Sequence, residues 1–212
     1  MDFRDAIQNY TGQPLNKQIL LDLLKEYKRP YDKINELVKQ ELIIQVKRGM
    51  YIPGPKLKID KPEPFLLANH ILAPSYISLD TALSYWRLIP ERVYEISSVT
   101  TLNTKTYKTK VGRFSYAHIP LPYYSFGIKQ IELTKQQTTL IATPEKALCD
   151  KIVTTKGIIL RSKKQVIELL TENLRIDKLA LWNLDVAEMN SWLKDAPKKT
   201  SLIMLVKALK YL

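Results

Sequence analysis

The chain has 212 residues and a formal net charge of +12, from 33 Lys and Arg against 21 Asp and Glu. With 45% hydrophobic and 25% charged residues, its composition is that of a globular protein with one large or two small cores, which excludes a disordered chain. A single cysteine excludes a disulfide framework and a thiolate zinc site, and no apolar run approaches the roughly 20 residues that span a bilayer.

The first ten residues are polar and amphipathic and lack the pattern of a signal peptide, so we expect a cytoplasmic protein without membrane contact. The excess of positive charge favours an anionic partner, most commonly nucleic acid. Residues 99–140 contribute strongly to that excess, with six basic side chains against one acidic side chain.

The first part of the chain is expected to form three helices and a hairpin. Apolar side chains recur at helical spacing, and Pro30 suits the first turn of the third helix. A β-rich segment follows, turns at Arg48-Gly49 and returns. The expected helices cover residues 3–10, 16–27 and 31–40, and the expected strands cover residues 42–47 and 50–52.

Residues 53–64 are rich in Pro and Lys, and we interpret them as a linker that few contacts cross. After the linker, residues 64–71 and 78–86 are expected to be helical and residues 93–142 to form strands. Further helices follow, with N-caps expected at Thr143, Ser162, Asp177 and Asp185. The predicted fold is α+β. A DNA-binding domain over residues 1–54 precedes an α+β domain over residues 65–212, with a mostly antiparallel sheet and a helical C-terminal part.

Catalytic motifs are scarce. The six glycines build neither GxGxxG nor a phosphate-binding loop, and the two histidines lack metal-ligand spacing. Cys149 lies in an apolar stretch and is expected to be a small buried hydrophobe. Glu26-Tyr27-Lys28 fits the ExK pattern of nucleases, but it falls on an amphipathic helix where solvated charge explains it better. We therefore expect no enzyme, no cofactor and no metal.

The order of three helices and a hairpin is typical of a winged helix-turn-helix. In such a unit the third helix enters the major groove and the hairpin, or wing, meets phosphates. With Ile34 and Val38 facing the core, polar residues of this helix face outward. Asp32 and Glu36 are among them and repel phosphate, so a protein-interaction module stays an alternative. The residues expected to contact DNA are Arg29, Tyr31, Lys33, Asn35, Lys39, Gln40, Lys47, Arg48 and Tyr51.

Three segments resemble a known family, the AbiEi-type antitoxins. LVKQELIIQVKRGMYIPG (37–54) is similar to the family's helix-to-wing segment, where a basic pair and Gly precede an aromatic residue. APSYISLDTALSYWRLIPERVYEISSVTT (73–101) resembles its small-residue helix, Ile-Pro-Glu turn and strand. ATPEKALCDKI (142–152) resembles its Thr-Pro-Glu-Lys-Ala-Leu helix start. The likeness covers roughly residues 14–155.

The resemblance implies a transcriptional regulator of a bacterial type IV toxin-antitoxin, or phage-defence, operon. Such regulators bind inverted repeats in double-stranded DNA upstream of their own genes. Their functional partner is a nucleotidyltransferase-like toxin, with which no stable complex is expected, and the second domain is implicated in antitoxicity. A winged-helix interaction module without specific DNA binding is the alternative, and a nuclease-like enzyme is a more distant one.

Overall fold

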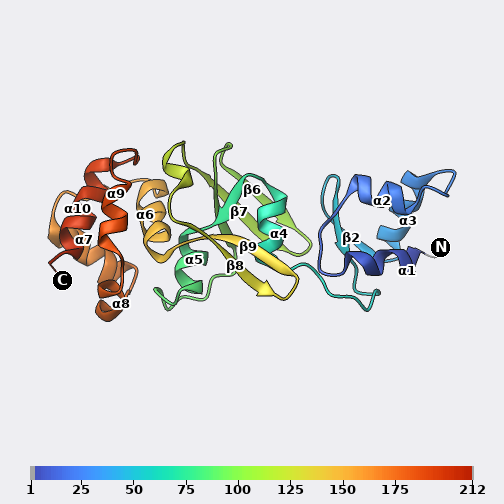
Figure 1. The fold of residues 1–212 in the computed structure, drawn as a ribbon, viewed down its shortest axis with the longest axis horizontal. Helices are drawn as coiled ribbons and strands as arrows, with labels where there is room; N and C mark the ends of the chain where they lie inside the picture. The colour runs from blue at the N-terminus through green and yellow to red at the C-terminus, as the bar shows by residue number, and fades with distance from the viewer. Residues whose placement is uncertain (1–2, 212) are drawn as a thin grey trace.

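The computed structural model describes residues 3–211 and contains two sheets and ten α-helices within them (Figure 1). The first sheet has three antiparallel strands in the order β1-β3-β2, packed with three helices. The elements of this N-terminal part are α1 (Phe3–Ala6), a 3-10 turn (Ile7–Tyr10), β1 (Leu15–Asn16), α2 (Lys17–Leu23), α3 (Pro30–Lys39), β2 (Ile43–Lys47) and β3 (Met50–Pro53).

The second helix is shorter than its apolar pattern predicts. Asn16 caps α2 by accepting a hydrogen bond from the backbone N–H of Ile19 at 2.8 Å. The helix ends at Leu23, after which the chain turns and buries Leu24 completely in the N-terminal core. Strand β1 was not predicted, because two residues are too short to show an alternating pattern.

The second sheet has six strands in the order β6-β7-β5-β4-β9-β8. The β4–β9 and β5–β7 pairs are parallel and the other three are antiparallel, so the prediction of a mostly antiparallel sheet is confirmed. Its elements are α4 (Pro64–Ile71), β4 (Ser75–Ile77), α5 (Leu79–Tyr85), β5 (Ile96–Thr100), β6 (Lys105–Thr109), β7 (Gly112–His118), a 3-10 turn (Tyr123–Ser125), β8 (Ile128–Thr134) and β9 (Gln137–Ala142).

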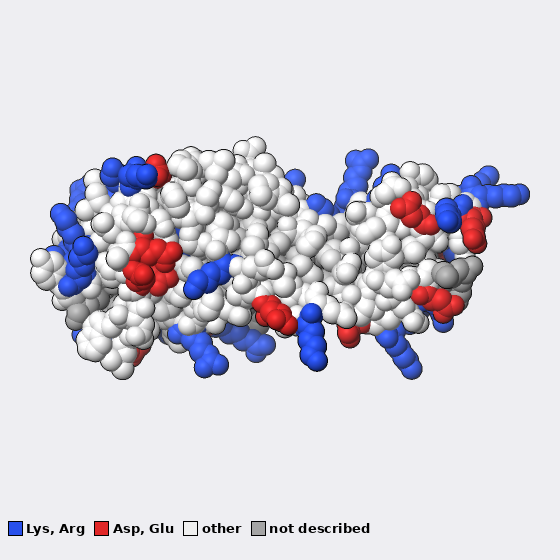
Figure 2. Space-filling model, in the orientation of Figure 1, with Lys and Arg blue, Asp and Glu red and all other residues white. Residues whose placement is uncertain are grey.

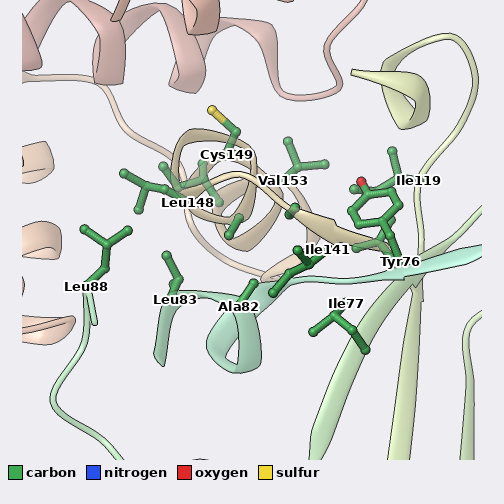
Figure 3. Close-up of a cluster of buried hydrophobic side chains, with 14 of the residues drawn as sticks. Tyr76, Ile77, Ala82, Leu83, Leu88, Ile119, Ile141, Leu148, Cys149 and Val153 are labelled. Carbon is green, nitrogen blue, oxygen red and sulfur yellow. The ribbon is translucent and has the colours of Figure 1, made fainter. Parts of the chain in front are cut away.

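Helix α6 (Pro144–Thr154) closes the core of the second part. The predicted N-cap is confirmed, because the Thr143 hydroxyl accepts a hydrogen bond from the Lys146 backbone N–H at 3.2 Å. Figure 3 shows Leu148 and Val153 of α6 on the side of the helix that faces α5 and β4, whereas Cys149 points away from them. Sheet and helices therefore share one apolar core.

The C-terminal part is helical and lies at the end of the molecule opposite to the N-terminal part (Figure 1). It contains α7 (Lys163–Glu168), a π-helical turn (Leu169–Asn173), α8 (Lys178–Trp182), α9 (Val186–Ser191) and α10 (Lys199–Leu209). Ser162, Asp177 and Asp185 each accept a backbone N–H at the start of a helix, which confirms the three predicted caps.

Residues 53–64 do not behave as a free linker. Leu57 is only 8% exposed and packs in the N-terminal core. The Gln137 side chain accepts a hydrogen bond from the Glu63 backbone N–H at 2.6 Å and donates to the Lys61 carbonyl at 3.3 Å. These contacts hold the segment against the N-terminal core on one side and against β9 on the other.

Candidate nucleic-acid interface

Helix α3 presents one apolar and one polar face. Pro30 occupies the first turn, and Ile34 and Leu37 are 3% and 2% exposed. Val38 is half-buried beside them. The remaining side chains point away from the core, as the helical spacing predicts: Asp32, Asn35, Glu36, Lys39 and Gln40 are exposed, and Lys33 is half-buried.

Glu36 occupies the middle of the polar face and engages two of the expected DNA contacts. The Lys33 ammonium donates to its carboxylate at 2.9 Å, and the Gln40 amide donates to the other oxygen at 2.7 Å. The hydrogen bond from Lys33 lowers the pKa of the Glu36 carboxyl. Lys33 also lies 5.3 Å from the Tyr27 ring centroid. Lys33 or Gln40 can therefore contact a base only after its hydrogen bond to Glu36 is broken.

Asn35 and Lys39 are the least encumbered groups of this face. Both are exposed, and neither side chain has a hydrogen-bonding or ionic partner among residues 3–211. Arg29 precedes the helix with its side chain 85% exposed, at 3.9 Å from Asp32. Tyr31 is 54% exposed, with the Lys17 ammonium 4.5 Å from its ring centroid.

The hairpin places its predicted contact residues differently. Gly49 has a φ of +77°, the left-handed conformation that the turn requires, and the neighbouring Arg48 is exposed. The Lys47 ammonium, however, donates to the Ile71 carbonyl at the end of α4, at 2.5 Å. Tyr51 is 9% exposed and packs in the N-terminal core.

The β2–β3 hairpin is buried because its apolar side chains pack into two different cores. Val46, Met50 and Ile52 join the core of the second part, while Tyr51 between the last two faces the other way. This packing carries Lys47 toward α4 and turns Tyr51 to the opposite, N-terminal core. As arranged here, neither side chain faces solvent where a phosphate could meet it.

The charge of this end of the molecule is mixed. In the view of Figure 2, blue and red side chains alternate over the N-terminal part, without a uniform basic face. Exposed Asp32, Glu36 and Glu41 contribute the acidic groups near α3. A hollow of about 430 Å³ beside the helix is lined by both signs, including Lys28, Arg29 and Asp32.

A second polar cluster, which the sequence analysis did not single out, lies inside the second part. Lys146 and Asp150 are both 0% exposed on α6, with the Lys146 ammonium 3.0 Å from the Asp150 carboxylate. Tyr76 and Ser78 donate to the other carboxylate oxygen, each at 2.8 Å. Lys and Asp four residues apart, next to the apolar run of the same helix, were the available signal.

This buried cluster has the features of a structural network. Burial raises the pKa of Asp150 and lowers that of Lys146, while each opposite charge counters these shifts. The neighbouring Cys149 is 1% exposed, as predicted, and burial raises the pKa of its thiol to about 12. No group of three or more His, Cys, Asp or Glu in the described part of the chain is placed to hold a metal.

Comparisons with known proteins complete the description of the candidate site. No protein-family model matches the chain, and no curated protein matches it significantly. Along residues 3–211, no helix combines the length and apolar character needed to cross a membrane.

Proposed function

We propose that this protein is a DNA-binding transcriptional regulator with an N-terminal winged helix-turn-helix. The order of helix, short strand, two helices and hairpin, with β1 paired to the last strand, supports this assignment. The observation that carries the proposal is the polar face of α3, where Asn35 and Lys39 are exposed and unengaged beside Arg29.

In this proposal α3 enters the major groove. Asn35 pairs with an adenine edge and Lys39 with a guanine edge, while Arg29 and Arg48 contact phosphates. Tyr31 lies at the margin of the interface, as do Lys33 and Gln40, which are bound to Glu36. Lys47 and Tyr51 are left out of it because the former binds the Ile71 carbonyl and the latter is buried.

The biological role follows from the resemblance to AbiEi-type antitoxins. We propose that the protein represses its own operon through inverted repeats and opposes a nucleotidyltransferase-like toxin without forming a stable complex with it. The second domain then carries the antitoxicity, and the protein acts in the cytoplasm without catalysis or cofactor. A growth assay with co-expressed cognate toxin tests this part, and absence of protection by the full chain would refute it.

DNA binding is tested by the affinity for double-stranded DNA from upstream of its own gene, measured at several salt concentrations. The two proposed phosphate contacts, from Arg29 and Arg48, predict a slope of log K against log salt of roughly −2. Arg48→Ala is expected to reduce the magnitude of the slope by about 0.9. Lys164→Ala, which removes an exposed lysine on α7, serves as the control and leaves the slope unchanged. A slope near zero contradicts the proposed interface.

A protein-interaction module is the second candidate function. The acidic groups of α3, Asp32 and Glu36, favour it because they repel a phosphate backbone. The mixed charge of the hollow beside them suits a protein partner. The same titration separates the two functions. Equal, weak affinity for upstream and scrambled DNA would favour the interaction module.

A further inference from the structure

A pocket at the far end of the molecule from α3 is lined by three arginines. It has a volume of about 510 Å³ and lies between the loop after α5 and the segment that leads into α8. We call it the arginine pocket; its charged lining residues are Arg87, Glu91, Arg92, Arg175 and Asp177. Figure 1 shows α8 at the lower end of the helical part.

The two carboxylates of the arginine pocket are committed to partners within the chain. Glu91 forms an ion pair with Arg175, whose Nε donates to it at 2.8 Å. Asp177 accepts the backbone N–H of Leu179 at 2.7 Å and so caps α8. The positive charges of Arg87 and Arg92 are therefore not matched by a carboxylate within the described residues.

One polar atom of the pocket lacks a partner. Glu91 Oε2 is buried and receives no hydrogen bond from the described part of the chain. Because this oxygen is closed off from solvent, a ligand in the pocket cannot reach it, and it adds nothing to the binding surface. The pocket therefore offers a ligand the unmatched guanidinium groups of Arg87 and Arg92.

Exposed apolar side chains border the pocket on the α8 side. Leu179 and Trp182 are 63% and 60% exposed, and their spacing of three puts them on one side of the helix. The lower left end of Figure 2, where α8 lies, is mostly white. On the other side of the pocket Tyr94 is 83% exposed, with the Arg92 guanidinium 5.5 Å from its ring centroid.

We propose that the arginine pocket and the Leu179–Trp182 face of α8 together bind an acidic segment of a partner protein. The partner's carboxylates pair with Arg87 and Arg92, and an adjacent apolar side chain of the segment covers Leu179 and Trp182. Arg, Trp and Tyr are the residue types that dominate binding energy at protein interfaces. A nucleic-acid backbone fits less well, because it has no aliphatic side chain to cover the exposed Leu179 and Trp182.

This surface is independent of the proposed DNA interface. It lies in the second part of the chain, at the opposite end of the long axis from α3 (Figure 1). Variants of α3 that lose DNA binding should therefore still bind the acidic segment. Variants of the arginine pocket should likewise still bind DNA.

The test is selection of binders from an unbiased library of random short peptides displayed on phage, with the full-length protein as bait. The double variant Arg87→Ala/Trp182→Ala changes two exposed residues, so its circular dichroism spectrum is expected to match that of the wild type. Peptides enriched on the wild type should carry acidic residues next to an apolar one. Their synthetic versions should bind the double variant at least about tenfold more weakly. The control variant Arg161→Ala/Leu121→Ala removes an exposed arginine and an exposed leucine elsewhere and should bind normally.

Three results would overturn the inference. The first is that no peptide is enriched on the wild type. The second is that enriched peptides lack acidic residues or bind the double variant as tightly as the wild type. The third is that single-stranded DNA binds the wild type tightly and loses affinity in the double variant, which would assign the surface to nucleic acid instead.

Discussion

Lys146 and Asp150 show how much a single side chain can contribute to this fold. The Lys146 ammonium also donates to the Tyr123 carbonyl at 2.8 Å, so both charges are satisfied only by groups inside the core. Removing one partner leaves the other buried and unpaired. We expect Asp150→Ala to lower the free energy of unfolding by about 3–5 kcal/mol, measured by urea denaturation.

An exposed ion pair gives the control for this prediction. Lys151 and Asp80 lie 2.7 Å apart with side chains 23% and 40% exposed, and Asp80→Ala should cost at most about 1 kcal/mol. The double variant Lys146→Met/Asp150→Leu removes both charges and should recover part of the loss, because no unpaired charge stays buried. Equal effects of Asp150→Ala and Asp80→Ala would show that the buried pair has no special role.

Buried acidic groups also predict a loss of stability at alkaline pH. Burial raises the pKa of Cys149 to about 12 from the ordinary 9.0, and it raises the pKa values of Tyr76 and Tyr123 well above 10.0. Above pH 9.0 the unfolded chain therefore releases protons that the folded chain keeps, so rising pH favours unfolding. Each such group contributes a fall of about 1.4 kcal/mol per pH unit within its window.

Lys146 acts in the opposite direction, because its lowered pKa makes the folded chain lose that proton first. Lys146 opposes the decrease only below its ordinary pKa of 10.5, because above that value the unfolded chain has lost the same proton. The urea midpoint should therefore fall between pH 10.5 and about 12, and Cys149→Ala should weaken this dependence. Identical midpoints at the two pH values would contradict the buried protonated states of these groups.

At the scale of elements, the DNA-binding function that we propose predicts that base specificity resides on the exposed face of α3. Asn35→Ala should relax the preference at one operator position by roughly 1–3 kcal/mol while the fold is retained, because Asn35 is exposed and has no partner in the described chain. A selection assay with randomised operators measures the change. Asn190→Ala, an exposed position on α9, is the matched control. Unchanged preferences in the Asn35 variant would place base readout elsewhere.

Local signals in the sequence predicted most helices and strands, because capping and periodicity act over a few residues. Thr143, Ser162, Asp177 and Asp185 could be identified as caps from their type and the apolar run that follows. Strand β4 escaped detection, since three buried residues carry no alternation. Its parallel pairing with β9 depends on a contact between residues far apart in the chain, which no local pattern encodes.

In the candidate interface, too, only the features that depend on local spacing could be predicted from the sequence. Helical spacing was enough to place Asn35 and Lys39 on the exposed face of α3. It could not place Lys47 or Tyr51, because their surroundings depend on how the hairpin packs against α4 and the N-terminal core. The pairing of Glu36 with Gln40 was likewise hidden among several equally spaced polar side chains.

At the scale of the whole molecule, the N-terminal part is docked on the second part. Ile52 lies in the shared core, and Lys47 binds the end of α4. A groove of about 1040 Å³ remains between the parts, bordered by the linker segment and the turn between β8 and β9. Separate folding of residues 1–54 and 65–212 stays a prediction, and these contacts imply that each fragment would expose apolar surface that the full chain buries.

Gln137 is the side chain that ties the linker segment to the second sheet. It is 5% exposed, and its amide bonds the backbone of both Glu63 and Lys61. The backbone N–H of Gly12 donates to the Asp60 carbonyl at 3.0 Å, which secures the segment from the N-terminal side. Gln137→Ala removes two hydrogen bonds and is expected to destabilise this attachment by about 1–3 kcal/mol, so the segment should open more often.

Limited trypsin digestion of the full chain measures this opening, because Lys56 and Lys58 are exposed cleavage sites within the segment. Local opening that becomes easier by about 1.4 kcal/mol raises the cleavage rate roughly tenfold when the segment recloses faster than it is cut. The exposed neighbour Gln136 provides the control, and Gln136→Ala should be cut at the wild-type rate. Equal rates for both variants would mean that the docked arrangement depends on the apolar contacts of the hairpin, with Gln137 contributing little.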